Sequence, residues 1–376
     1  MKGSGRDEWG ANIDLSYRKG KFNISNTTEI NGYKTTESPY GSFSTYVKAN
    51  PYYRKLGTDV RYLEQTYDII NLGQNYDVTN PLYNAALNSY NGSKNFAIQN
   101  ALQVKVNIAD NLLAQVAFQI QKGITTGQQF ISPLNTTFDS ANAFEKGSYT
   151  NNRTDNFDYN GYAMLSYGKV FNEKHALTTD LRAEIRDDDN ENRSYAAVGF
   201  PNASNGNPSF AYSYQPNSRP SSVKSKSRSD ALLFTANYIY DKRYFADASI
   251  RYDGSTAFGS SNPYTPYYSG GLGWNVNNEK GIKDIKWITL IRLRANIGVT
   301  GNQNFSSYSS IDTYNYFSGI NPYGQGVLLS TLGNPNLEAQ KTVQTNIGTD
   351  VALWGNKLNF TINAYRKKTS PLVVAV

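Results

Sequence analysis

Residues able to carry out chemistry are few in this sequence. Cys is absent, and His occurs once in 376 residues, as His175. Thiolate metal sites and Cys nucleophiles are therefore excluded, and a single imidazole argues against a His-based metal site or a Ser-His triad. We expect no catalytic residue, no metal ligand and no cofactor, and hence no enzyme.

Carboxylates form the main charged clusters. The run Asp187–Glu191 could hold Ca²⁺ in an outer loop, but EF-hand Gly spacing is missing, and a solvated charge run is the simpler interpretation. Asp180 and Glu184 share one face at strand spacing, as two glycosidase carboxylates would. Because Arg182 and Arg186 alternate with them, we expect a neutralised polar ladder instead.

Aromatic side chains in the polar segments are stronger candidates for binding. Their faces stack on sugars and give large contact areas to partner proteins. The alternative is that they pack the loops against one another. The candidate substrate or partner contacts are Tyr52, Tyr53, Tyr212, Tyr214, Tyr314, Tyr316, Phe317 and Tyr323.

Alternation with a period of two residues marks the elements that must position these side chains. It recurs in about twelve segments, most of them about 9–12 residues long, whereas soluble strands usually have about 5–6. The segments are Trp9–Tyr17, Phe22–Ile30, Phe96–Ile108, Leu112–Gln121, Phe157–Tyr167, Leu177–Arg186, Leu232–Tyr240, Tyr244–Asp253, Tyr268–Val276, Ile291–Val299, Val343–Leu353 and Leu358–Ala364.

Composition agrees with strands. Aromatic residues make up 14% of the chain, charged residues only 18%, and Gly reaches 30, which favours an all-β protein with many turns. The net charge of +7 has no dense Lys/Arg block behind it, which argues against nucleic acid as a partner.

The connections alternate between short and long. Short turns fall at 18–21, 108–111, 168–174, 241–243 and 354–357, with a medium link at 277–288. Long loops fall at 32–93, 122–153, 188–227 and 300–340, with a moderate one at 254–266. Outer-membrane barrels have such short periplasmic turns and long extracellular loops. The predicted fold is all-β, an antiparallel transmembrane β-barrel segment with its apolar face toward lipid and its charged face toward a polar lumen.

Aromatic residues on the apolar face support this orientation. Tyr17, Tyr167, Tyr240, Tyr244 and Trp274 lie near the short turns, where an interfacial girdle would sit. The alternative is that aromatic residues simply favour strands.

Several stretches resemble the SusC/RagA-like family of TonB-linked outer-membrane transporters. Ala339-Gln340 departs from the family's Trp-Glu pair. The stretches are RYDGSTAFGSSNPY (Arg251–Tyr264), YYSGGLGWNVNNEKGI (Tyr267–Ile282), LRANIGVTGNQNFSSY (Leu293–Tyr308) and the segment Gly333–Thr369 with its GNPNLEAQ start, together with SPYGSFSTYVKANPYYRK and NPLYNAAL upstream.

The resemblance implies a function, a location and partners. It implies TonB-energised import of oligosaccharides or peptides across the outer membrane of a Bacteroidetes-type Gram-negative cell. The implied partners are a SusD-like surface lipoprotein, a TonB-like complex acting through a plug domain, and outer-membrane lipid. Residues 1–376 would form a partial barrel domain of about 12 of an expected 22 or so strands, without signal sequence, plug or C-terminal strands.

Two other functions remain open from the residues alone. One is a soluble carbohydrate-binding or adhesin-type β protein that uses the loop aromatics as its platform. The other is a secreted glycosidase, for which the sequence singles out no suitable carboxylate pair. Strand length and loop asymmetry favour the transport barrel over both.

Overall fold

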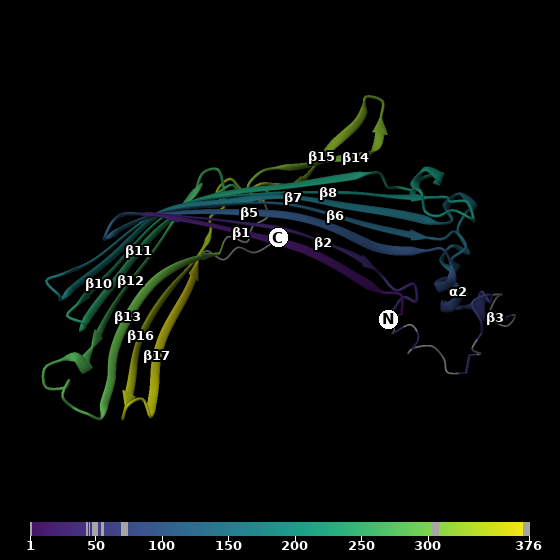
Figure 1. The fold of residues 1–376 in the computed structure, drawn as a ribbon. Helices are drawn as coiled ribbons and strands as arrows, with labels where there is room; N and C mark the ends of the chain where they lie inside the picture. The colour runs from purple at the N-terminus through teal and green to yellow at the C-terminus, as the bar shows by residue number, and fades with distance from the viewer. Residues whose placement is uncertain are drawn as a thin grey trace.

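One curved antiparallel sheet dominates the protein (Figure 1). The computed structural model describes residues 2–42, 44, 46, 52, 53, 56–68, 74–302 and 308–370. Within these residues the sheet has thirteen strands, twelve of which form one continuous path. In order they are β1 (Gly5–Lys19), β2 (Phe22–Thr36), β5 (Tyr90–Ala109), β6 (Leu112–Ile131), β7 (Ser148–Phe171), β8 (His175–Val198), β10 (Ser221–Tyr240), β11 (Tyr244–Ser255), β12 (Tyr264–Asn275), β13 (Ile288–Asn302), β16 (Gln340–Leu353) and β17 (Leu358–Ser370).

These strands form an up-and-down meander. Each pairs antiparallel with the next on the path, and β9 (Ser213–Tyr214) adds to the end of β8. Two hairpins, β3 (Tyr62–Asp68) with β4 (Gln74–Thr79) and β14 (Thr313–Asn321) with β15 (Gly324–Thr331), lie outside the sheet. All twelve predicted segments are strands of the path, so the predicted fold class is confirmed.

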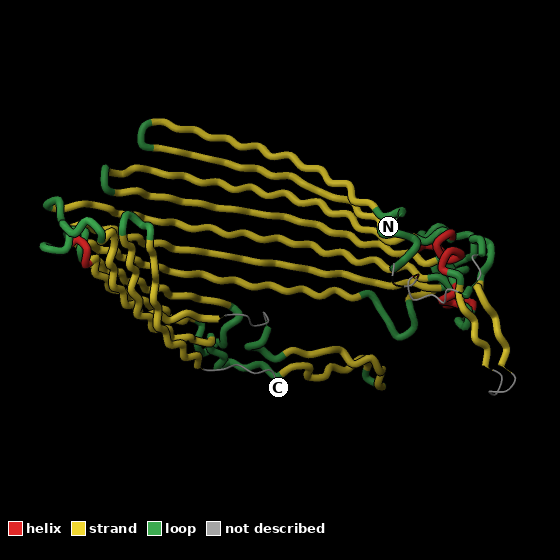
Figure 2. Tube along the Cα trace, turned by 90° about the horizontal axis from the view of Figure 1, so that it is seen from below, coloured by secondary structure: helices red, strands yellow, loops and turns green. Residues whose placement is uncertain are grey.

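The short turns and the long loops lie at opposite ends of the strands (Figure 2). We call these two sides of the sheet the turn edge and the loop edge. The loop edge carries α2 (Pro81–Ala86) and the short 3₁₀ turns η1 (Thr136–Phe138), η2 (Ala143–Glu145) and η3 (Pro208–Phe210), whereas η4 (Val276–Asn278) lies at the turn edge. The tight turns use left-handed backbone: Asp241 and Lys242 have φ of 51° and 57°. Consecutive positive φ values are typical of hairpin turns that match the twist of their strands.

Strands β7 and β8 run well past the segments predicted for them. Each has 24 residues, so the loops expected at 122–153 and 188–227 shrink to 132–147 and 199–220. The prediction failed there because alternation of apolar and polar residues marks only the part of a strand that has an apolar environment on one side. Beyond that part the backbone ladder continues, but both faces carry polar residues.

One face of the sheet is apolar and exposed. Leu15, Leu272 and Ile347 are 63%, 67% and 63% exposed, and no second layer covers this face in the described part of the chain. We call it the outward face, and the opposite one the inner face. Exposed apolar surface of this extent marks a site that contacts lipid or another protein. Among the described residues, no helix has the length and apolarity needed to cross a bilayer.

Aromatic residues gather at the turn edge of the outward face. The rings of Tyr240 and Tyr244 stack 6.3 Å apart, and those of Tyr244 and Trp274 stack 6.2 Å apart. Tyr17 and Tyr167 also lie within four residues of the turn end of their strands. This is the predicted placement of the girdle residues.

Both clusters of buried apolar side chains lie at the loop edge. One cluster contains Phe130, Tyr149, Ala197 and Phe200. A second contains Phe258, Tyr267, Val299 and Ala339. The loops are therefore packed structures anchored on the strand ends.

Candidate functional site

A cavity of about 940 Å³ opens at the loop edge, between the first long loop and the ends of β2, β5, β6 and β7. Its lining mixes polar and apolar groups and is almost uncharged, with Glu37 as its one ionisable acid or base apart from the Tyr90 phenol. Eight Ser and Thr residues and six amide residues supply the polar groups of the lining, the amides being Asn84, Asn91, Gln128, Gln129, Asn135 and Asn152. Amides both donate and accept hydrogen bonds, so this lining suits a ligand rich in hydroxyl or amide groups.

Asn80 fixes the first long loop beside this cavity. Its side chain is 1% exposed and accepts a hydrogen bond from the Leu82 N–H at the start of α2. It also donates to the carbonyl oxygens of Gly57 and Val60, at 2.9 and 2.7 Å. A buried amide with three satisfied bonds ties the helix to the loop before it. The NPLYNAAL stretch therefore forms a capped helix.

Helix α2 then joins the next loop. The Asn84 amide donates to the Thr136 hydroxyl at 2.7 Å and accepts from the Thr136 N–H at 3.1 Å. Because Asn84 lines the cavity, these two bonds set the position of one wall.

The inner face carries paired charges along the middle of the sheet. Arg182 Nε lies 2.7 Å from Glu184 Oε1, and Arg251 reaches the same carboxylate at 2.9 Å. The Arg182 guanidinium also stacks over the Tyr162 ring, 3.8 Å from its centroid. Asp180 accepts hydrogen bonds from two hydroxyl groups. The predicted neutralised ladder is confirmed, and these carboxylates face cations and hydroxyls rather than each other.

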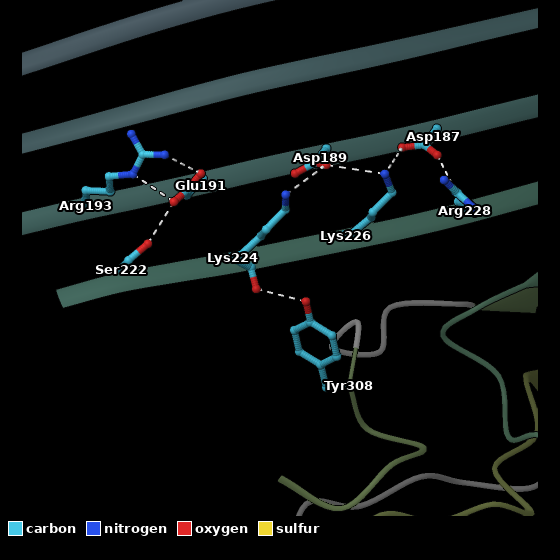
Figure 3. Close-up of polar contacts among 9 residues, drawn as sticks. All are labelled: Asp187, Asp189, Glu191, Arg193, Ser222, Lys224, Lys226, Arg228 and Tyr308. Atoms are coloured by element: carbon cyan, nitrogen blue, oxygen red, sulfur yellow. Dashed lines mark hydrogen bonds and ion pairs between the residues drawn. The ribbon is translucent and has the colours of Figure 1, made fainter. Parts of the chain in front are cut away.

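The acidic run Asp187–Glu191 is a corrected prediction. It was expected to be a solvated run in an outer loop, but it lies inside β8, and Asp187 is 1% exposed. Its outward-facing carboxylates pair with cations of the adjacent strand β10 (Figure 3). Asp187 binds Arg228 and Lys226, whereas Asp189 binds Lys226 and Lys224.

Glu191 is the last acid of this ladder and lies six residues beyond Ile185 on the same face of β8. Arg193 donates two hydrogen bonds of 2.7 Å to it, and Ser222 donates a third at 2.8 Å. These hydrogen bonds, that of Arg193 first, hold the pKa of Glu191 below its usual range. A carboxylate so stabilised stays ionised, which keeps the ladder intact.

A similar cluster orders the medium link at the opposite edge. Glu279 accepts hydrogen bonds from the Tyr244 hydroxyl at 2.7 Å, Trp274 Nε1 at 3.0 Å and Arg243 at 3.0 Å. The bond from Tyr244, followed by that from Trp274, lowers the pKa of the Glu279 carboxyl. Girdle residues thus also anchor the turn.

Most of the predicted aromatic contacts are exposed, and they fall into three places. Tyr52 and Tyr53 lie in the first long loop, Tyr212 packs against Phe144 with ring centroids 4.6 Å apart, and Tyr214 lies against Tyr195 at 6.2 Å. Hairpin β14–β15 carries the others: Tyr314, Tyr316, Phe317 and Tyr323, the side chain of Phe317 lying outside the described residues. None of the eight lines the cavity.

The cavity amides were missed at the sequence level. Asn and Gln are scattered throughout the chain, so their type carries no signal. The register of β5, β6 and β7 brings four of these amides together, and α2 and the loop at η1 add Asn84 and Asn135. No group of three or more His, Asp or Glu side chains able to hold a metal ion occurs among the residues that the structure describes.

Two of the motifs that carry the family resemblance contact each other. The Gly259 N–H donates to the Leu337 carbonyl at 2.9 Å, and the Ser261 N–H donates to the Pro335 carbonyl at 3.0 Å. A Cβ on Gly259 would meet the Pro335 oxygen at 2.1 Å, so this approach requires glycine. The Phe-Gly loop and the Asn-Pro-Asn-Leu segment are therefore two halves of one interface.

Comparisons with known proteins identify relatives along the whole chain, although no family model matches it. TonB-dependent receptor P39 of Formosa agariphila is 26% identical over 381 residues, which cover 100% of this chain and 35% of that protein. TonB-dependent receptor SusC of Bacteroides thetaiotaomicron is 29% identical over 146 residues, 37% of this chain and 15% of SusC.

Solved structures agree on the fold. The RagAB peptide importer in its open-open state matches with a TM-score of 0.78 at 19% identity, covering 99% of this chain and 41% of the matched one. The chain thus spans about a third of the first relative's length, and two fifths of the matched structure. The resemblance found in the motifs is confirmed: the chain is related to the TonB-dependent receptors of the SusC/RagA-like family, and corresponds to part of their length.

Proposed function

We propose that this chain forms part of the barrel wall of an outer-membrane importer. The complete protein would take up large nutrients, oligosaccharides or peptides, with energy supplied through a TonB-like complex acting on a plug domain. Residues 1–376 would be one section of the barrel domain.

The observation that carries this proposal is the two-faced sheet. The outward face exposes apolar side chains such as Leu15 and Ile347, whereas the inner face holds neutralised pairs such as Arg182–Glu184. Exposing an apolar face of this size to water costs about 25 cal/mol per Å². Placing it in lipid removes that cost, and leaves the charged face toward a hydrated lumen.

The uncharged polar cavity supports a polar substrate. Its amides suit either sugar hydroxyls or peptide bonds, and the scarcity of charge favours ligands without strong ionic groups. RagAB, which has a similar fold, is described as a peptide transporter, and this supports peptides. The sequence similarity to SusC names no substrate and leaves oligosaccharides open. We therefore retain both substrate classes.

Hairpin β14–β15 supports a partner at the loop edge. It projects beyond the sheet (Figure 1), and the register pairs Tyr314 with Leu329 and Tyr316 with Val327. All four side chains are more than half exposed. Exposed aromatic and aliphatic pairs of this kind favour protein contact, and we propose that a SusD-like surface lipoprotein covers them.

Fractionation of cells that carry the complete receptor gene tests the location. We expect the receptor in the outer membrane, with heat-modifiable migration on gels. Folded, fully soluble receptor recovered without detergent would contradict the proposal and would support the soluble carbohydrate-binding alternative.

A matched pair of glycine variants tests the cavity. Gly127 lines it, and a Cβ there would meet only the Asn152 oxygen at 3.9 Å, so Gly127→Trp fills space without backbone conflict. Gly123 lies on the same face of the same strand, and a Cβ there would also have room, but Gly123 does not line the cavity. We expect Gly127→Trp to reduce nutrient uptake several-fold at unchanged outer-membrane level, and Gly123→Trp to leave uptake near wild type. Equal uptake by both would remove the cavity from the substrate path.

A further inference from the structure

Cations form a row across the outward face of five adjacent strands. The register places Lys34 of β2 opposite Lys94 of β5, which lies opposite Thr126 of β6. Thr126 in turn lies opposite Arg153 of β7, which lies opposite Arg193 of β8. We call Lys34, Lys94, Arg153 and Arg193 the cation row, and all four are exposed.

The row contains two directly opposed pairs of like charge, which destabilise a sheet unless something compensates them. Arg153 and Arg193 are compensated. Arg153 holds Asp155 through bonds of 2.9 and 3.1 Å, and Arg193 holds Glu191. Hydrogen bonding to Arg153 holds the pKa of Asp155 below its usual range, so this acid stays charged.

Lys34 and Lys94 differ from the arginines. Neither ammonium forms an ion pair with any residue that the structure describes. Asp7 of β1 lies opposite Lys34 in the register and forms no such pair with it. Two facing ammonium groups that form no close ion pair with a described residue make this end of the row a site for an anion.

The position of the row indicates which anion. Phe96 lies two residues after Lys94 on the same face of β5, about 7 Å farther along the strand toward the turn edge. Its ring lies 6.2 Å from that of Trp9. Farther along β5 the outward face carries Ile98, Leu102, Val104 and Val106, interrupted by Asn100, whose amide donates hydrogen bonds to Asn26 and Thr28. Aromatic rings followed by cations are typical of the level where hydrocarbon gives way to headgroups.

We propose that Lys34 and Lys94 together bind a phosphate group of an outer-leaflet lipid, with the acyl chains of that lipid lying on the apolar face below. This inference rests on the proposed membrane location. A phosphate bridging the two ammonium groups would turn a repulsive pair into two charge-assisted hydrogen bonds. Continuity with the apolar face favours a lipid over free phosphate, because only a lipid occupies both surfaces at once.

The experiment compares Lys34→Gln/Lys94→Gln with a control, Lys105→Gln, in the complete receptor purified in detergent. Lys105 is on β5 as well, but its register with Asn23 and Gln115 places it on the inner face. Binding of bis-phosphorylated lipid A is measured by native mass spectrometry. We expect the double variant to bind about 30-fold more weakly, which corresponds to about 1 kcal/mol for each lysine. Lys105→Gln should bind as the wild type does.

Two further probes identify the source of the anion. Dephosphorylated lipid A should bind wild type and double variant alike, and inorganic phosphate at millimolar concentration should not displace the phosphorylated lipid. Equal affinity of the double variant and wild type for phosphorylated lipid A would overturn the inference, as would efficient displacement by free phosphate. If the receptor is still located in the outer membrane, either of these two results rejects the lipid site and leaves the proposed function standing. A receptor that is not in the outer membrane would contradict both the lipid site and the proposed function.

Discussion

Asp187 is the residue whose substitution most directly tests the ladder between β8 and β10. Its carboxylate is 1% exposed, accepts a hydrogen bond from Arg228 Nε and lies 3.6 Å from Lys226 Nζ. Asp187→Asn keeps the shape of the side chain and removes its charge. Arg228 then loses its partner, whereas Lys226 keeps its pair with Asp189 at 3.3 Å.

The expected cost follows from how far each partner is buried. Breaking a fully buried ion pair costs about 3–5 kcal/mol, because the remaining charge is left without water. The Arg228 and Lys226 side chains are 61% and 39% exposed, so both regain hydration when Asp187 is neutralised. Exposed pairs are worth about 0–1 kcal/mol. The intermediate case predicts a loss of about 1–2 kcal/mol in the free energy of unfolding.

Asp188→Asn is the matched control. Asp188 is the next residue, faces the inner side and pairs with Arg186 at 2.8 Å, with carboxylate and guanidinium 36% and 65% exposed. We expect its loss to cost no more than about 0.5 kcal/mol. Urea unfolding of the complete receptor in vesicles, followed by gel mobility and tryptophan fluorescence, gives both values. A control as destabilising as Asp187→Asn, or an Asp187→Asn receptor as stable as wild type, would refute the reasoning.

Three other substitutions test separate parts of the structure. Asn80→Ala removes the cap of α2 and two loop bonds, and should cost about 1–2 kcal/mol locally, seen as faster limited proteolysis of the first long loop. Gly259→Ala drives a Cβ into the Pro335 oxygen and should cost about 1–3 kcal/mol in urea unfolding, whereas Gly270→Ala, with 3.7 Å of room, should cost less than about 1 kcal/mol. Glu279 has a folded-state pKa below its ordinary 4.5, so its contribution to the free energy of unfolding is present above pH 4.5 and is lost as the pH falls through the folded-state pKa. Glu279→Gln should therefore reduce the loss of stability at acid pH, measured by unfolding at a series of pH values.

The sequence predicted the strands well because a sheet with one apolar face has a strict pattern. Every second residue of Phe96–Ile108 is apolar except Asn100, and this alternation is visible in a single sequence. The tight turns followed from the same pattern, since they are the gaps between alternating segments. The twelve strands of the path could therefore be predicted from the sequence.

The loop edge could not be predicted for the opposite reason. Residues Asp187–Glu191 and Ser222–Arg228 contain no apolar alternation, yet they pair in perfect register, because complementary charge replaces hydrophobic burial as the constraint. Complementary charge leaves no period in a single strand, and only the pairing reveals it. The cavity amides are hidden in the same way, since they come from several different strands and loops.

The extended strands explain how long loops can hold a defined cavity. A loop attached at the membrane surface would have to order itself against water, at a cost of about 1–2 kcal/mol per fixed residue. Here β7 and β8 run on past the apolar band, and their backbone bonds carry the loop anchors with them. Ion pairs such as Asp189–Lys226 keep β10 in register with β8 where no lipid constrains it. The charged ladder is therefore a scaffold for the loop edge, and its loss should loosen the loops before it unfolds the sheet.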